Sequence, residues 1–370
     1  MNNLTLESEY LIKLIKNVIN EEEISPAPEG MDWKSFIDLA KKQQVYSVIA
    51  EALEKLNIPK EQKQQLTLYS QNELLRMLAM KSEFEEIEQE LNEKEIKYML
   101  LKGSVLRRYY PKEKMRQMSD MDILYDFEKR DSLLKIMKKR GYRLTATCEN
   151  SDDFFKEPFY TFEWHRELFF KEAKFSPRFD LWEKSVQDSE KPYKYHIDPT
   201  QHFVYTICHM FKHFITNGCG IRFLCDIYLL LKNDKDIDME SAKKQLEDIE
   251  IYDFAKNVIE LSQSIFFGGE ISDVQREILD FMLSNGVYGI FIIDYKEKLE
   301  EYSNSKFKYL FYRLFPPKKK MKAEYKILEK KPFLLPIYYF VRLFTKFRYN
   351  SSKAKNELKQ IKNIDKNNGG

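Results

Sequence analysis

Two aspartates separated by one residue, Asp120 and Asp122, lie in the segment MSDMDILYD. The segment alternates in polarity, which predicts a β-strand. Because alternate side chains of a strand point to the same face, both carboxylates are expected to project to one side. Two converging carboxylates form a hard oxygen site suited to Mg²⁺. The alternative is a solvated strand end, since a chain with 59 acidic residues among 370 contains acid-x-acid pairs by chance.

A turn formed by Lys102, Gly103 and Ser104 directly follows the apolar segment YMLL. A strand, a glycine turn and the start of a helix together present backbone N–H groups to a phosphate. The alternatives are that Ser104 caps the helix and that Gly103 simply permits the turn. The turn is not a Walker loop, because the Gly-x-x-x-x-Gly-Lys pattern is absent from the sequence.

A third acidic candidate, Asp180, lies in the segment RFDLWE. A strand is predicted over residues 175–182, with Phe179 and Leu181 facing the core and Asp180 facing the other side of the sheet. Taken alone, Asp180 is better explained as an acidic residue on an edge strand.

The elements that must position these residues follow one another in three zones. Periodicity predicts helices over residues 5–22, 33–57 and 60–94, the last with a charged, solvent-facing end. Strand and helix patterns alternate between residues 96 and 182, and helical patterns return from residue 199. This order predicts an α+β fold, in which a small mixed-sheet domain is embedded between N-terminal helices and a larger C-terminal all-helical region.

The predicted division of the chain has five parts. They are an N-terminal helical region (1–94), an α/β domain (95–198), a helical domain (199–305), a basic aromatic helical segment (306–350) and a flexible tail (351–370).

Charge is unevenly distributed along the chain, although the formal net charge is only +2. Residues 306–370 carry 18 basic and 4 acidic side chains, whereas residues 1–305 carry 43 basic and 55 acidic ones. The acidic body argues against a chain-wide nucleic-acid binder. The basic aromatic segment 306–350 is expected to dock on that body; contact with an anionic membrane or with nucleic acid is the alternative.

Four cysteines without paired short spacing argue against a zinc site and favour a reducing compartment. The first residues lack the pattern of a signal peptide, and no run approaches the ~18–20 apolar residues of a membrane span. A cytoplasmic location is therefore expected, with peripheral membrane contact through residues 306–350 as an open alternative.

The order of these motifs resembles the nucleotidyltransferase superfamily of the DNA polymerase beta type. A Gly-Ser turn ends one strand, the Asp-x-Asp pair follows sixteen and eighteen residues after Ser104, and Asp180 comes some sixty residues later. The resemblance implies that the Gly-Ser loop holds a triphosphate, that Asp120 and Asp122 bind two Mg²⁺ ions, and that Asp180 completes the site.

A closer resemblance is to one bacterial branch, the uncharacterised nucleotidyltransferase family, over residues 96–231. The motifs that carry it are LLKGSVLRRYY, Arg116, SDMDILYD, WHREL with His165, FDLWE, the pair His209 and His213, and then Arg222 and Asp226. The chain departs from the pattern at Trp182, where the family has a histidine after Asp-Leu.

The resemblance also implies the roles of the individual residues. Asp180 would ligate the metal nearer the acceptor and help deprotonate its hydroxyl. Gly103 and Ser104 would hold the β- and γ-phosphates, while Lys102 and Arg116 would add positive charge there. Lys102 and Arg116 have the alternative role of ordinary surface ion-pair residues.

Histidines at positions 202, 209 and 213 share one helix face by their spacing. His209 and His213 are expected to line the cleft against the α/β domain or to pack with aromatic residues. Binding of a transition metal is the less favoured alternative. Arg222 and Asp226 are four residues apart, so they can pair with each other or reach the nucleotide or the acceptor.

These observations predict a Mg²⁺-dependent nucleotidyltransferase. It would move a nucleoside monophosphate from an NTP to a hydroxyl acceptor (a small molecule, a sugar or a protein) and release pyrophosphate. The alternative is a non-catalytic nucleotide-binding or scaffold protein of the same fold, with or without membrane contact. All three carboxylates are present, which favours the enzyme.

Overall fold

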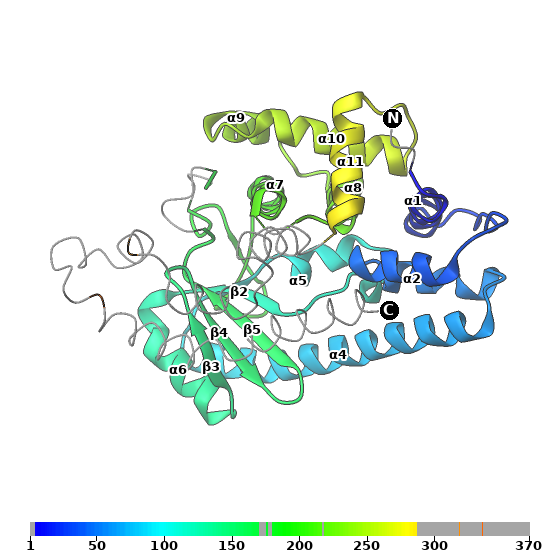
Figure 1. The fold of residues 1–370 in the computed structure, drawn as a ribbon. Helices are drawn as coiled ribbons and strands as arrows, with labels where there is room; N and C mark the ends of the chain where they lie inside the picture. Colours follow the sequence, from blue (N-terminus) through cyan, green and yellow to red (C-terminus); the bar gives the residue numbers. More distant parts are fainter. Residues whose placement is uncertain are drawn as a thin grey trace.

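A computed structural model describes residues 4–169, 175–176, 180–216 and 218–286, together with residues 318 and 335. The chain begins with helices and ends, within these residues, with helices; a mixed sheet lies between them (Figure 1). The α+β fold class predicted from the sequence is confirmed. Apart from residues 318 and 335, the predicted segments 306–350 and 351–370 lie outside the described residues.

The N-terminal helices follow the predicted apolar periodicity, with one interruption. They are α1 (Leu6–Ile19), α2 (Trp33–Lys42), α3 (Tyr46–Ile49), the 3₁₀ helix η1 (Ala50–Lys55) and α4 (Lys60–Glu93). The single helix predicted over 33–57 is wrong, because the chain turns at Gln44, whose φ is +54°. A left-handed residue cannot continue a right-handed helix, so α2 ends before it and α3 begins after it.

The sheet has seven strands in the order β3-β4-β5-β2-β1-β7-β6. Their bounds are β1 (Tyr98–Leu100), β2 (Met121–Tyr125), β3 (Arg143–Thr147), β4 (Ser151–Lys156), β5 (Tyr160–His165), β6 (Val186–Gln187) and β7 (Lys194–His196). Strand β2 is central, with β1 antiparallel on one side and β5 parallel on the other. All five of its residues are buried, so the position of β2 is set by the core on both faces.

The strand predicted through Asp180 is wrong. Residues 181–184 form a turn, in which the Asp180 carboxylate accepts a hydrogen bond from the Trp182 N–H at 2.8 Å. The Asp180 carbonyl lies 3.3 Å from the Glu183 nitrogen, which donates to it. Aspartate commonly stabilises turns in this way, by binding the backbone two residues on.

Two hydrophobic cores hold the elements together. One joins α4, the helix α6 (Arg130–Lys139) and one face of the sheet, and Figure 1 shows α4 running along that side. The C-terminal half of α4 was predicted to face solvent, but Phe84, Ile87 and Leu91 are buried in this core. The charged neighbours of these residues occupy the remaining faces of α4 and include Glu83 and Glu90, which pair with Arg140 at the end of α6.

The second core lies among the C-terminal helices and includes the N-terminal ones. The helices are α7 (Pro199–Thr216), α8 (Arg222–Asn233), α9 (Met239–Asp248), α10 (Tyr252–Phe266) and α11 (Asp273–Asn285). The buried Gln43 amide joins the two ends, since its nitrogen donates to the carbonyls of Met282 and Leu283 and its oxygen accepts from Ile221 N–H. Among the described helices, none combines the length and the apolar character needed to cross a membrane.

Candidate functional site

A cavity of about 320 Å³ opens where the ends of β2 and β5 face α7 and α8. Nine of the eleven candidate residues line it: Lys102, Gly103, Arg116, Asp120, Asp122, His209, His213, Arg222 and Asp226. The side chains of Ser104 and Asp180 are not among those that line the cavity. The fold therefore brings together residues from five separate motifs of the sequence.

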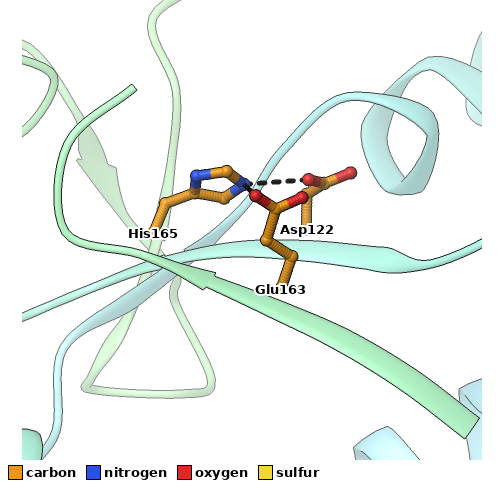
Figure 2. A group of neighbouring side chains, drawn as sticks. All are labelled: Asp122, Glu163 and His165. Carbon is orange, nitrogen blue, oxygen red and sulfur yellow. Dashed lines mark hydrogen bonds and ion pairs between the residues drawn. The ribbon is translucent and has the colours of Figure 1, made fainter. Parts of the chain in front are cut away.

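An acidic cluster forms at one end of the cavity from β2 and β5. The parallel register of these strands places Asp122 beside Glu163, and His165 follows two residues later on the same face. His165 Nε2 lies 2.9 Å from Asp122 Oδ1 and 3.7 Å from a Glu163 oxygen, as Figure 2 shows. One ligand atom from each of the three residues lies within 4.8 Å of the others. Two carboxylates and an imidazole at this spacing can hold a divalent metal ion.

Glu163 was not predicted as a site residue. Its signal was present in TFEWHREL, where Glu163 and His165 are separated by one residue on a strand, as Asp120 and Asp122 are. The sequence did not show which strand pairs with β2, and only that pairing brings Glu163 to Asp122. Asp180 is exposed in a turn and does not enter this cluster.

Lys102 extends into the same acidic cluster. Its Nζ lies 2.6 Å from Asp122 Oδ1 and 4.0 Å from Glu163 Oε2. Burial alone would raise the pKa of Asp122, but the Lys102 ammonium and the His165 ring outweigh burial and lower that pKa below its usual value. Lys102 is therefore not an ordinary surface ion-pair residue: its charge is directed at the cluster.

Asp120 precedes β2 and is half-buried at the mouth of the cluster. Its pKa is raised to about 6, first by burial and then by the negative charge of Asp122. The group of potential metal ligands found among the described residues consists of Asp122, Glu163 and His165 and does not include Asp120. The convergence of the Asp120 and Asp122 carboxylates on a metal stays a prediction.

The turn after β1 is tightly packed. A Cβ at Gly103 would lie 2.8 Å from Met118 Cγ, so the close approach of these segments requires glycine. Ser104 Oγ is buried and has no hydrogen-bond partner among the described residues, and the four-residue helix α5 (Gly103–Leu106) has no side-chain cap. The expected capping by Ser104 is therefore not observed, and its contact with a phosphate stays a prediction.

Arg116 is engaged in a buried ion pair with Asp226. The Arg116 Nε lies 2.6 Å from Asp226 Oδ1, and Nη2 lies 2.8 Å from Oδ2. The hydroxyl of Tyr110 donates a further hydrogen bond to Asp226 Oδ1 at 2.8 Å. Arg222 was one expected partner of Asp226, but Asp226 pairs with Arg116, which ties the loop before β2 to α8. Arg116 therefore positions the site, and its charge is already balanced.

His209 and His213 face the cavity, as the favoured prediction stated. Their ring centroids are 4.5 Å apart, and both pack near Phe223 of α8. The pKa of His213 is lowered to about 3, first by burial and then by the nearby cations Lys102, Lys212 and Arg222. Both rings are thus neutral at physiological pH, because the pKa of His209 is also lowered, mainly by burial. They do not belong to the metal-ligating group found among the described residues.

His202, on the same helix, is buried and lies outside the cavity. Neither ring nitrogen has a hydrogen-bond partner in the described part of the chain, and burial lowers the pKa of His202 to about 4. As pH falls, His202 therefore takes up a proton near pH 6.5 in the unfolded chain but only near pH 4 in the folded protein. The stability that neutral His202 contributes is consequently lost as pH falls from about 6.5 toward 4.

Replacing His202 with phenylalanine should reduce this pH dependence. Between pH 7 and pH 5, the free energy of unfolding of the wild type should fall by about 1–2 kcal/mol more than that of His202→Phe. Urea denaturation at both pH values measures the difference. His196→Phe is the control, because His196 is exposed and is bonded to Asp188. Equal pH slopes for wild type and His202→Phe would contradict the assignment.

A comparison with protein families matches residues 29–267 to a family model described as an uncharacterised nucleotidyltransferase. The chain belongs to this nucleotidyltransferase family. The matched range contains every residue that lines the cavity. No curated protein and no solved structure matches the chain.

The cavity combines two kinds of charged side chain. The acidic cluster on β2 and β5 suits a metal ion, and Lys212 of α7 and Arg222 of α8 also line the cavity. General nucleotidyl transfer is the activity of the family, and this cavity is the candidate place for it.

Proposed function

We propose that this protein is a Mg²⁺-dependent nucleotidyltransferase that transfers a nucleoside monophosphate from an NTP to a hydroxyl acceptor and releases pyrophosphate. The observation that carries the proposal is the pairing of Asp122 and Glu163 on neighbouring parallel strands, at a cavity that also contains lysine and arginine side chains. The motif order further supports a bacterial member of the DNA polymerase beta-type superfamily.

Asp122 and Glu163 would hold the metal, with His165 and Asp120 beside them. Bound there, Mg²⁺ would neutralise charge that develops on the reacting phosphate. The two-ion arrangement expected from the sequence remains part of the proposal, with Glu163 in the place first given to Asp180. Glu163 is preferred because it is paired with Asp122 in the sheet, whereas Asp180 caps a turn.

The remaining cavity residues would bind and orient the nucleotide. Lys212 and Arg222 would bind phosphate oxygens, together with the backbone at Gly103. Phe223 and the neutral rings of His209 and His213 form an aromatic wall of the cavity. The Arg116–Asp226 pair would keep the loop that carries Asp120 fixed against α8. Catalysis would then rest on positioning and electrostatics.

A thermal-shift series tests both the activity class and the choice of carboxylate. An NTP that binds the folded state should raise the melting temperature of the wild type, and more so with Mg²⁺. Glu163→Gln should lose the Mg²⁺-dependent part of the shift, whereas Asp180→Asn should keep it. All four NTPs are compared at equal concentration, with and without EDTA.

If Asp180→Asn loses the Mg²⁺-dependent shift and Glu163→Gln keeps it, Asp180 and not Glu163 is the third carboxylate of the metal site. A shift that is unaffected by Mg²⁺ in the wild type would favour the non-catalytic nucleotide-binding alternative.

A cytoplasmic location is part of the same proposal. It is supported by the four cysteines, which lack paired short spacing in the sequence and three of which are buried among apolar side chains. The acceptor class (small molecule, sugar or protein) and peripheral membrane contact through residues 306–350 remain predictions from the sequence.

A further inference from the structure

Lys102 lies where the metal ligands converge. Its ammonium contacts Asp122 Oδ1 at 2.6 Å and approaches Glu163 Oε2 at 4.0 Å. His165 Nε2 lies 2.9 Å from that same Asp122 oxygen, and Figure 2 shows how closely the three ligand side chains approach one another. The Asp122 oxygen that a divalent cation would need is therefore already in contact with a cation that belongs to the protein.

The backbone at Lys102 is held in a conformation that lysine rarely adopts. Its φ is +50° and its ψ is −127°, a region that favours glycine and costs other residues of order 1–3 kcal/mol. The Lys102 carbonyl is fixed by hydrogen bonds from the N–H groups of Val105 and Leu106. This conformation lies at the end of β1, next to β2, and the ammonium of the side chain lies against the carboxylates of β2 and β5.

Charge balance explains why an ammonium is held there. Asp120, Asp122 and Glu163 all line the cavity, and three neighbouring carboxylates repel one another when no cation is near. Lys102 supplies one positive charge to this cluster. A divalent cation bound to the same oxygens would lie within a few ångströms of the ammonium, and two cations at that distance repel strongly.

We propose that Lys102 is an internal counter-ion which a divalent metal must displace, and that the phosphates of the incoming nucleotide accept the displaced ammonium. The inference rests on the proposed function, and it adds a coupling between the two ligands. Free metal binds weakly because it must separate Lys102 from Asp122 without providing it a new partner. Metal and nucleotide together bind well, since the phosphates provide that partner.

The affinity for Mn²⁺ alone tests this coupling without any measurement of turnover. Electron paramagnetic resonance of free Mn²⁺ reports the dissociation constant for wild type, Lys102→Gln and Lys102→Gly. Both variants should bind Mn²⁺ about tenfold or more tightly than the wild type. Lys102→Gly should fold even if Lys102→Gln does not, because glycine adopts a φ of +50° without strain.

Lys212→Gln is the matched control. Lys212 also lines the cavity, so its loss removes one positive charge from the same space while the ion pair of Lys102 with Asp122 stays in place. The Mn²⁺ affinity of this variant should rise by no more than about two- to threefold, because the metal must still displace Lys102. An equal gain in Lys212→Gln and Lys102→Gln would show a general charge effect and overturn the proposal.

A second measurement separates this inference from the proposed function. The wild type should be stabilised little by Mn²⁺ alone and clearly by Mn²⁺ with a non-hydrolysable NTP analogue, whereas Lys102→Gln should be stabilised by Mn²⁺ alone. If both Lys102 variants bind Mn²⁺ with the wild-type affinity, and the wild type binds Mn²⁺ together with the analogue, only the counter-ion role is contradicted. If no variant binds Mn²⁺, with or without the analogue, both the proposed function and this inference are contradicted.

Discussion

Asp122→Asn is expected to abolish nucleotidyl transfer and to leave the protein folded. The amide keeps the size of the side chain but lacks the charge that would bind the metal, and it no longer pairs with the Lys102 ammonium. Removing one electrostatic partner of a reacting group commonly reduces turnover by roughly 10²–10³-fold, and a lost metal ligand should cost at least that much. Pyrophosphate release from NTP, in the presence of a cell extract that supplies acceptors, measures the loss.

Asp126→Asn is the matched control for this prediction. Asp126 follows the same strand, and its carboxylate accepts a hydrogen bond from the Glu128 N–H, at a position that does not line the cavity. It should retain transfer. Circular dichroism of both variants checks that the fold is intact. Undiminished pyrophosphate release by folded Asp122→Asn would reject the metal-ligand assignment of Asp122.

The second large effect concerns stability. Asp226→Ala is expected to lower the free energy of unfolding by about 3–5 kcal/mol, because it leaves the buried Arg116 guanidinium without its partner. The side chains of Arg116 and Asp226 are 5% and 1% exposed, so water does not replace the lost interaction. Tyr110 also loses the acceptor of its hydroxyl. Urea denaturation measures the change.

A double variant distinguishes an unpaired charge from a loss of packing. Arg116→Met combined with Asp226→Leu removes both charges, so it should recover a substantial part of the stability lost in Asp226→Ala. Asp236→Ala is the control, since Asp236 is exposed beyond the end of α8 and should change stability by less than about 0.5 kcal/mol. If the double variant were as unstable as Asp226→Ala, the cost would lie in packing and not in the unpaired arginine.

Local sequence signals located most of the elements. Apolar periodicity predicted α4 with nearly the observed bounds and placed the return of helical structure at residue 199, where α7 begins, because the pattern of a helix depends on residues only a few positions apart. The alternation in MSDMDILYD likewise predicted β2. The same signals were insufficient at Asp180, where apolar neighbours suggested a strand but the aspartate instead bonds the backbone of a turn.

The buried half of α4 shows a different limit. Its many charged residues suggested exposure, yet one stripe of Phe84, Ile87 and Leu91 covers the sheet. A helix can be charged on most of its surface and still bury a stripe wherever a partner lies. Its burial therefore depends on the tertiary neighbour as well as on its own composition.

The sequence by itself determined the chemical types available to this protein: the Asp-x-Asp pair, the Lys-Gly-Ser turn, and the histidine, arginine and aspartate positions of the helical half. Only the tertiary structure decided which of them meet. Glu163 reaches Asp122 through the pairing of β2 with β5, and Arg116 reaches Asp226 across 110 positions of the chain. Such contacts depend on strand order and helix packing, which are properties of the whole core, so a local pattern does not contain them.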